Sequence, residues 1–425
     1  MTSALQRGPQ NGADPSRADH ADPEPGRPFR GLAGRNWVPH RLGVPLAGSS
    51  LASARWSAPQ SPDGNDQHIR ATRVGSVWTT WRAATQDALY GRDGFYARGE
   101  RPAAHFRTSV HVSPRYAEAV LALLCHTDEV LGHPDRLDLV DIGAGQGELL
   151  SQVLRLAQQL PAGHGPAGPW SSFPQRITAR AVEVAPRPPG ADERIRWASV
   201  LPTRIRGLVV ASEWLDNVPV DVAELTPDGP RIMLVDPGSG AEQPGPAAGP
   251  AEQEWLRQWW PLQHPGERAE LGHPRCAAWA GVIRRLAGGL ALAADYAHSR
   301  AHRPLAGTLA GFRDGRAVRP IPDGSRDITA HVALDACAAA GTAAGATQTV
   351  LTTQRAALRA LGLTGRRPPL SQADRDPAGY LAALRLAAEE AELTDPGGLG
   401  GFGWLVQAAG VPLPRALAGL TDQGV

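Results

Sequence analysis

The chain has 425 residues, of which 42% are hydrophobic and 20% are charged, and its formal net charge is +1. This length accommodates one large domain with insertions or two ordinary domains, and the hydrophobic share is sufficient for a sizeable core. A nearly neutral chain has no overall attraction to nucleic acid or to an anionic membrane, so we expect neither partner.

Cysteine usage and hydropathy predict a soluble cytoplasmic protein. The three cysteines, Cys125, Cys276 and Cys337, lie far apart in the sequence, and the 13 histidines show no metal-ligand spacing. This is typical of a reducing compartment and predicts neither a disulfide framework nor a metal site. There is no apolar run of about 18 residues and no charged-then-apolar signal pattern. The sequence does not determine the oligomeric state.

Composition divides the chain into two parts. Residues 1–70 are rich in Pro, Gly and Arg without periodicity, which predicts disorder, and residues 71–425 are expected to form one domain. Within it, residues 161–174 and 237–250 read as Pro/Gly-rich loop insertions. A first helix is expected from about residue 77 to 89, and a second from 116 to about 124.

The most informative segment is a short apolar strand, 137–142, that leads into three glycines at alternate positions. After the glycines, residues 148–157 have the 3.6-residue apolar period of an amphipathic helix. Strand, glycine turn and helix start form the usual cradle for a nucleotide-like cofactor, because backbone N–H groups are exposed there. The candidate cofactor contacts in this segment are Asp141, Gly143, Ala144, Gly145 and Gly147.

The glycine spacing indicates which cofactor binds. A dinucleotide fingerprint, G-x-G-x-x-G, would place its third glycine at position 148, which is Glu148. The third glycine comes one residue earlier, at Gly147, giving D-x-G-x-G-x-G. This favours S-adenosyl-L-methionine (SAM), while nicotinamide or flavin binding and a plain tight turn stay open as alternatives.

Further apolar segments predict the rest of a parallel α/β sheet. Strands are expected at 177–184, 208–215 and 290–296, a helix at 276–287, and an antiparallel pair at 220–225 and 231–236. Ligands of such sheets bind beyond the carboxyl ends of the strands. The residues expected along this rim are Asp141, Gly143, Glu183, Ser212, Glu213 and Asp295.

Several rim residues have a functional and a structural interpretation. Glu183 ends the second strand, where a carboxylate can accept hydrogen bonds from both ribose hydroxyls, or can simply be solvated. Glu213 and Asp216 lie three residues apart and could hold a guanidinium, whereas Asp216 could also cap a helix. Asp295 and His298 follow a later strand and could accept a proton, although an isolated histidine is more often structural. Trp255, Trp259 and Trp260 have helical spacing that is more typical of a core.

Several blocks of the sequence together resemble the MidA-like methyltransferases, whose mitochondrial members are complex I assembly factors that methylate an arginine of a protein subunit. The blocks, in chain order, are 88–90 with 94–96, 106–109, 141–147, 183–184, 212–220, 295–298, 307–309, 327–332, 353–363 and 401–406. They extend over residues 77–411.

The resemblance implies a class I methyltransferase, Rossmann-like fold: a mostly parallel seven-stranded sheet with helices on both faces. An N-terminal helical cap and an inserted helical segment would complete it. It implies SAM as cofactor, with Glu183 and Ser212 on the cofactor side. It also implies transfer of a methyl group to a protein side chain, with Glu213, Asp216, Asp295 and His298 as catalytic candidates. A respiratory complex subunit is the substrate by analogy.

Three positions depart from the family pattern. Ser212 replaces the usual asparagine, Ala297 replaces the glycine before the histidine, and Ala104-His105 replaces Gly-Asp. These changes cluster on the presumed substrate side. Two other functions therefore stay open, a catalytically silent assembly chaperone that binds SAM and a small-molecule methyltransferase.

Overall fold

The computed structural model of the chain describes residues 78–96, 108–160 and 172–420, all of which belong to one unit, 40–425. The predicted disorder of residues 1–70 and most of the predicted loop at 161–174 lie outside the described residues. The end of that loop is helical, because α6 (Phe173–Arg176) begins within it.

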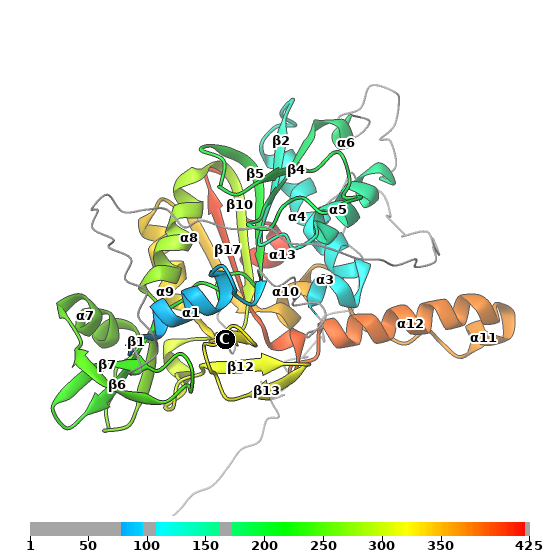
Figure 1. Cartoon of the computed structure of the whole chain (residues 1–425). Helices are drawn as coiled ribbons and strands as arrows, with labels where there is room; N and C mark the ends of the chain where they lie inside the picture. Colours follow the sequence, from blue (N-terminus) through cyan, green and yellow to red (C-terminus); the bar gives the residue numbers. More distant parts are fainter. Residues whose placement is uncertain (1–77, 97–107, 161–171, 421–425) are drawn as a thin grey trace, which may run out of the picture. The chain divides into compact units, whose positions relative to one another are not determined.

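The central feature is a seven-stranded sheet with the order β16-β17-β10-β5-β2-β3-β4 (Figure 1). The strands are β16 (Gln348–Thr353), β17 (Gly403–Ala409), β10 (Leu286–Asp295), β5 (Ile205–Ser212), β2 (Leu137–Ile142), β3 (Ile177–Val182) and β4 (Arg196–Ala198). The pairs β10–β5, β5–β2, β2–β3 and β3–β4 are parallel, whereas β17 is antiparallel to both of its neighbours. The predicted α/β class is confirmed, and the sheet is mixed.

Helices cover both faces of this sheet, which explains why its central strands are continuously apolar. Helices α4 (Pro114–Val130) and α5 (Glu148–Gln158) lie on one face, and α8 (His273–Arg285) and α9 (Leu334–Ala343) lie on the other (Figure 1). On the second face, Trp279 and Ile283 of α8 pack against Val140 and Val209 of the strands. No helix within the described ranges is long and apolar enough to span a bilayer.

Strands β2 and β5 approach each other closely at a glycine. Gly207 has φ 153°, and a Cβ atom at this position would lie 1.9 Å from the backbone oxygen of Asp138. Only glycine therefore fits there without displacing one of the two strands.

The segment inserted between β5 and β10 is mainly a second sheet, so the predicted helical insertion is wrong. The sheet contains β1 (Thr79–Thr80), β6 (Asp221–Thr226), β7 (Gly229–Val235), β8 (Glu242–Ala247) and β9 (Arg268–Leu271), with α7 (Pro250–Trp259) as the helix of the insertion that precedes α8. The predicted antiparallel pair is confirmed as β6 and β7. The N-terminal helix α1 (Trp81–Tyr90) packs on this sheet, where Trp81 contacts Val222 and Met233. Trp255 and Trp260 are buried core residues.

The predicted loop at 237–250 is also wrong in part, because β8 lies within it. This strand pairs with β7 alone. A strand that pairs on one side tolerates proline, such as Pro244, because its missing N–H faces away from the partner strand. Its composition hides it, since Pro and Gly interrupt the alternation that normally indicates a strand.

After β10 the chain forms further helices and short strands, and β16 and β17 return it to the main sheet. The helices and short strands are β11 (Ala297–His298), β12 (Ala310–Arg313), β13 (Arg316–Val318), β14 (Asp327–Thr329), β15 (Val332–Ala333), α10 (Gln354–Ala360), α11 (Ser371–Arg375), α12 (Pro377–Leu393) and α13 (Arg415–Ala418). Helix α12 packs on α3 (Ser109–Val112), which comes just before α4 in the chain.

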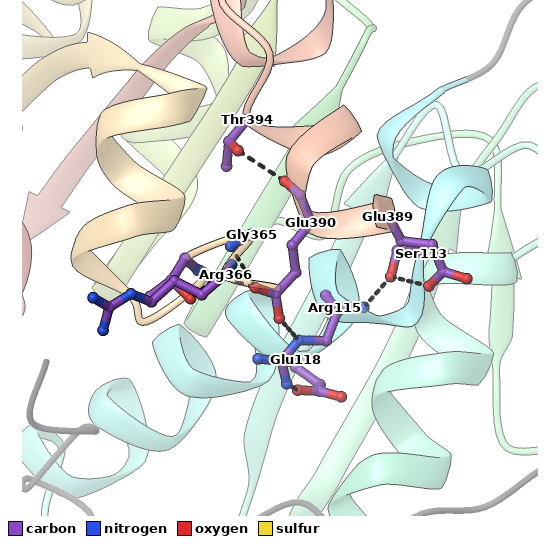
Figure 2. Close-up of polar contacts among 9 residues, drawn as sticks. Ser113, Arg115, Glu118, Gly365, Arg366, Glu389, Glu390 and Thr394 are labelled. Atoms are coloured by element: carbon purple, nitrogen blue, oxygen red, sulfur yellow. Dashed lines mark hydrogen bonds and ion pairs between the residues drawn. The ribbon is translucent and has the colours of Figure 1, made fainter. Parts of the chain in front are cut away.

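Helix α12 is fixed to the start of α4 by charged groups (Figure 2). Arg115 Nε donates to Glu390 Oε1 at 2.8 Å, and Ser113 Oγ donates to Glu389 Oε2 at 2.8 Å. The other Glu390 oxygen accepts the amide N–H of Gly365 at 2.8 Å. Glu390 is buried, so this ion pair joins three chain segments away from water.

The rim of the main sheet, where its parallel strands end, also includes residues of the antiparallel strand β17. Strands β2, β3, β5 and β10 all end there. Because β17 is antiparallel, its first residue, Gly403, pairs with both Asp295 at the end of β10 and Thr353 at the end of β16. Gln354 and Trp404 are therefore rim residues too.

Candidate active site

The loop between β2 and α5 lies at the rim, and the N–H groups of its glycines are bonded within the protein: Gly143, Gly145 and Gly147 donate to Val182 O, Glu183 Oε2 and Ala144 O at 3.0, 2.9 and 2.7 Å. Its three glycines all have positive φ, 71° for Gly143, 57° for Gly145 and 80° for Gly147. Gly143 and Gly145 are exposed and Gly147 is buried, and a side chain at Gly145 would be strained by the left-handed backbone and would fill the space above the loop. The predicted strand, turn and helix are confirmed with the bounds of β2 and α5.

Glu183 lies beside this loop, as predicted. Its Oε2 accepts the N–H of Gly145 at 2.9 Å, and its Oε1 accepts the N–H groups of Val184 and Ala185 at 2.6 and 3.2 Å. A carboxylate has about four acceptor positions, so three backbone bonds fix its orientation and leave capacity for a hydroxyl group. Burial raises the pKa of Glu183, and the three N–H groups oppose that shift.

The other predicted cofactor residues, Asp141, Ala144 and Ser212, differ in their burial and in their contacts. Asp141 and Ala144 are buried beneath the loop, and burial together with Glu148 and Glu183 raises the pKa of Asp141 well above its usual range. The Ser212 hydroxyl lies 2.6 Å from the hydroxyl of Tyr116 on α4. Asp141 and Ala144 therefore support the loop, and Ser212 connects β5 to α4.

Glu213 lies at the turn after β5, on the edge of this cradle. Its backbone is left-handed, with φ 53°, and its N–H donates to Ala294 O at 2.8 Å. The nearby backbone N–H of Ser109 opposes a rise in the pKa of its carboxyl. Burial and the neighbouring Asp216 raise the pKa of Glu213 to about 8. A non-glycine residue in this conformation is strained, and such strain is concentrated at functional sites.

Asp216 and Asp295 use their carboxylates to build the turn that carries Glu213. Asp295 Oδ2 accepts the N–H groups of Leu215 and Asp216 at 2.9 and 3.2 Å. Asp216 accepts from Asn217 Nδ2 at 3.1 Å and from Thr329 Oγ1 at 2.9 Å. Burial raises the pKa of both carboxyls. Three acidic groups thus lie in one water-poor region.

Arg275 of α8 binds the same turn through its guanidinium group. It is buried, and it donates to four backbone carbonyls: Asp216 at 2.6 Å, Val218 at 3.0 Å, Ala330 at 2.9 Å and His331 at 2.8 Å. Its charge also lowers the cost of keeping Asp216 and Asp295 ionised. No local sequence pattern indicated a role for Arg275.

A second hydrogen-bonded group connects the turn to the N-terminal helix. Asn217 Oδ1 accepts from the Tyr96 hydroxyl at 2.6 Å, and Asn217 O accepts from the Tyr90 hydroxyl at 2.9 Å. The Tyr96 hydroxyl also lies 3.5 Å from Asp327 Oδ1. Tyr90, Tyr96 and Asp327 were part of the family-like blocks, but neither their spacing nor their type indicated a role.

His298 does not have the geometry predicted for a proton acceptor. Arg303 Nη1 donates to its Nδ1 at 2.6 Å, and because a guanidinium cannot accept a hydrogen bond, the ring proton belongs on Nε2. Burial and Arg303 lower the pKa of His298 to about 3. The ring also packs edge-on against Trp260, with 4.5 Å between centroids. His298 is therefore a structural residue here, which corrects the sequence interpretation.

Two aromatic residues that the sequence did not indicate line the cradle. A Cβ atom at Gly143 would lie 3.3 Å from Trp214 Cδ1, and one at Gly147 would lie 3.2 Å from the Trp197 ring. Trp197 Nε1 donates to Ala185 O at 3.1 Å, which fixes its ring beside the loop. Both side chains restrict the space around the glycines.

Thiol and metal chemistry give no alternative site in the part of the chain that the structure describes. Its three cysteines are free, and no group of three or more His, Cys, Asp or Glu residues there could hold a metal ion. Cys276 and Cys337 are distant in sequence, but between α8 and α9 their thiols are near enough to shift each other's pKa.

Comparisons with known proteins agree with this site. Residues 121–352 match the sequence model of a family described as "Putative S-adenosyl-L-methionine-dependent methyltransferase". No curated protein matches the chain. Two solved structures of one superfamily from Burkholderia thailandensis are similar in fold. One, bound to S-adenosyl-homocysteine, has 23% identity and a TM-score of 0.66, covering 81% of this chain and 92% of that chain. The other has 24% identity and a TM-score of 0.66, covering 81% and 91%.

The chain belongs to this family of SAM-dependent methyltransferases, because the match includes more than half of its residues. The cofactor is SAM. The glycine loop and the Glu183 carboxylate fit it, since the glycines leave the backbone open beside a fixed acceptor for hydroxyl groups.

Proposed function

We propose that this protein transfers the methyl group of SAM to a nitrogen of a protein side chain, and that the side chain is arginine. The observation that carries the proposal is the position of Glu213: its carboxylate lies near the buried Asp216, and the next residue, Trp214, lies against Gly143 of the cofactor loop. The narrower assignment to the MidA-like branch, and to the class I arrangement of the sheet, belongs to the same proposal. The strand order with one antiparallel strand, β17, supports the class I arrangement of the sheet.

Bound SAM supplies an electrophilic methyl group on a sulfonium sulfur. The open backbone of Gly143 and Gly145 would receive the cofactor, and Glu183 would accept hydrogen bonds from its ribose. The remaining task of the protein is to align the acceptor nitrogen with the methyl group and to take its proton.

Glu213 is the group best placed to take that proton. Asp216, and Asp295 through its Oδ2, already accept hydrogen bonds from protein donors, whereas the Glu213 carboxylate keeps acceptor positions free for a substrate N–H. A base whose pKa is near the working pH is the most effective general base. The negative charges nearby favour a cationic acceptor such as a guanidinium over a neutral one.

Calorimetric titration with SAM tests the cofactor half of the proposal. The intact protein should bind SAM, and Gly145→Val should abolish binding, because the new side chain is strained at φ 57° and occupies the cradle. Gly132→Val is a matched control, since Gly132 has φ 73° but open space around it. Equal loss of binding in both variants would contradict a specific role for Gly145.

Labelling with radioactive SAM tests which molecule accepts the methyl group. The protein is incubated with SAM carrying a radiolabelled methyl group and a lysate of cells that lack it. A labelled protein band whose hydrolysate contains methylarginine is the expected result, and by analogy the band should be a respiratory complex subunit. Label in the organic-soluble fraction would indicate a small-molecule methyltransferase. No label despite SAM binding would indicate a silent assembly chaperone.

A further inference from the structure

We infer that Asn217 is a positioning residue for Glu213, and that the Tyr96 hydroxyl orients the Asn217 amide. The N-terminal segment that contains α1 thereby holds the turn after β5. The role of Asn217 in turnover rests on the proposed function, whereas its bond to the backbone of Glu213 does not.

The Asn217 amide connects three groups of the site. Its Nδ2 donates to the backbone oxygen of Glu213 and to Asp216 Oδ1, both at 3.1 Å. Its Oδ1 accepts from the Tyr96 hydroxyl at 2.6 Å. Both amide hydrogens and the amide oxygen are thus bonded, which holds the side chain in one orientation.

The direction of each bond follows from the partners. A backbone oxygen can only accept, so Asn217 Nδ2 must face Glu213 and Oδ1 must face Tyr96. The Tyr96 hydroxyl is therefore the donor. Asp327 Oδ1, at 3.5 Å from that hydroxyl, is the more distant of its two acceptors. The Tyr96 hydroxyl and the Glu213 oxygen together fix which way the amide points.

The backbone of Glu213 is in a conformation that needs support. Its φ of 53° is left-handed, which is unfavourable for a residue with a Cβ atom and persists only where the surroundings fix it. Its N–H donates to Ala294 O at 2.8 Å, and its C=O accepts from Asn217. The strand β10 therefore holds one side of this residue and Asn217 holds the other.

The comparison with other left-handed residues supports this interpretation. Within the described ranges, two further non-glycine residues have a positive φ, His133 with 54° and Asp314 with 52°. His133 follows the end of α4, and Asp314 begins the Asp-Gly turn of the β12–β13 hairpin, where such values are common. Both are also residue types that adopt this conformation more often than most. Glu213 has neither setting, so its conformation depends on bonds such as that from Asn217.

Tyr90 provides a matched control for Tyr96. Its hydroxyl also bonds Asn217, but it donates to the backbone oxygen, at 2.9 Å, and not to the amide. The rings of Tyr90 and Tyr96 lie 5.4 Å apart, and both residues are half-buried. Tyr90→Phe and Tyr96→Phe therefore remove the same atom from neighbouring rings, and only Tyr96→Phe removes a bond to the amide that holds Glu213.

The experiment is amide hydrogen exchange measured by NMR on the full chain labelled with ¹⁵N at glutamate. The Glu213 signal is the one that is missing in Glu213→Gln, and Glu129 within α4 serves as the reference for global stability. In Tyr96→Phe the Glu213 amide should exchange about tenfold faster than in the wild type, because loss of the bond to Asn217 loosens the left-handed turn. In Tyr90→Phe its rate should change by less than about twofold.

Equal rates at Glu213 in Tyr96→Phe and Tyr90→Phe would overturn the inference, whether both rise or neither does. If Tyr96→Phe does not fold, Asn217→Ala replaces it. This variant keeps the backbone oxygen that binds Tyr90 and loses both bonds of the amide nitrogen. Faster exchange at Glu213 relative to Glu129 is then expected, and an unchanged rate would be contrary evidence.

Turnover gives a second readout. At saturating SAM, Tyr96→Phe should label protein at about a tenth of the wild-type rate, while its affinity for SAM in calorimetry stays within about twofold, because Asn217 holds the proposed base and not the cofactor loop. A parallel loss of labelling and of SAM affinity would contradict a positioning role. Hydrogen exchange needs no substrate, so faster exchange in Tyr96→Phe without any labelling by the wild type would refute the proposed function alone.

Discussion

Replacing Glu213 by glutamine should stabilise the protein by an amount that grows with pH. The folded state raises the pKa of this carboxyl from 4.5 to about 8, so the folded chain keeps a proton that the unfolded chain releases. A raised pKa means that the stability is fully present below pH 4.5, falls as the pH rises toward 8, and is constant above that. Glutamine does not ionise and removes this loss.

The size of the effect follows from the two pKa values. One unit corresponds to 1.36 kcal/mol, so Glu213→Gln should raise the free energy of unfolding by about 3 kcal/mol at pH 7 and about 5 kcal/mol at pH 9. Near pH 4.5 the two proteins should differ little.

Urea unfolding followed by tryptophan fluorescence at pH 5, 7 and 9 measures this difference. Glu254→Gln is the control, because Glu254 lies on α7 with 58% of its side chain exposed beside Arg257. Its effect should be below about 1 kcal/mol and nearly independent of pH. A flat profile for Glu213→Gln, or a loss of stability that grows with pH, would refute the assignment of a raised pKa.

Three further substitutions test other parts of the site. Glu183→Gln should weaken SAM binding about tenfold or more in calorimetry, because a neutral amide cannot accept from two hydroxyls as an ionised carboxylate does, and it should also lower the unfolding midpoint, because its NH2 group would face a backbone N–H. Arg275→Met should lower the free energy of unfolding by about 3–5 kcal/mol in urea, since it leaves buried carbonyls without a donor. Gly207→Ala should lower it by about 3 kcal/mol or more, because the methyl group would overlap the β2 backbone; unchanged stability would show that the strands can separate there.

The cofactor half of the site was predictable because its signals are local. The apolar run of β2, the alternate glycines and the period of α5 lie within some 20 residues of one another, and Glu183 follows a recognisable strand. The acceptor half depends on contacts between distant segments, such as Tyr96 with Asp327, which are 231 residues apart. No sequence periodicity encodes such a contact.

The same reasoning explains the errors. His298 has the residue type of a general base, but its partner, Arg303, determines which ring nitrogen carries the proton. Strand β8 contains two prolines and a glycine in six residues, so its pairing with β7 is the only evidence that it is a strand. In both cases the decisive interaction comes from a residue that a local pattern does not include.

The order in which the sheet is assembled follows from β17. It is the last strand of the described residues, yet it lies between β10 and β16, and β16 pairs with β17 only. A chain emerging from the ribosome can therefore form the cofactor loop long before it can add β16 to the sheet. Until residues 403–409 are synthesised, Trp404 is not available to bind Gln354. The growing chain should thus form its cofactor loop before the last two strands of the sheet, β16 and β17, can join it.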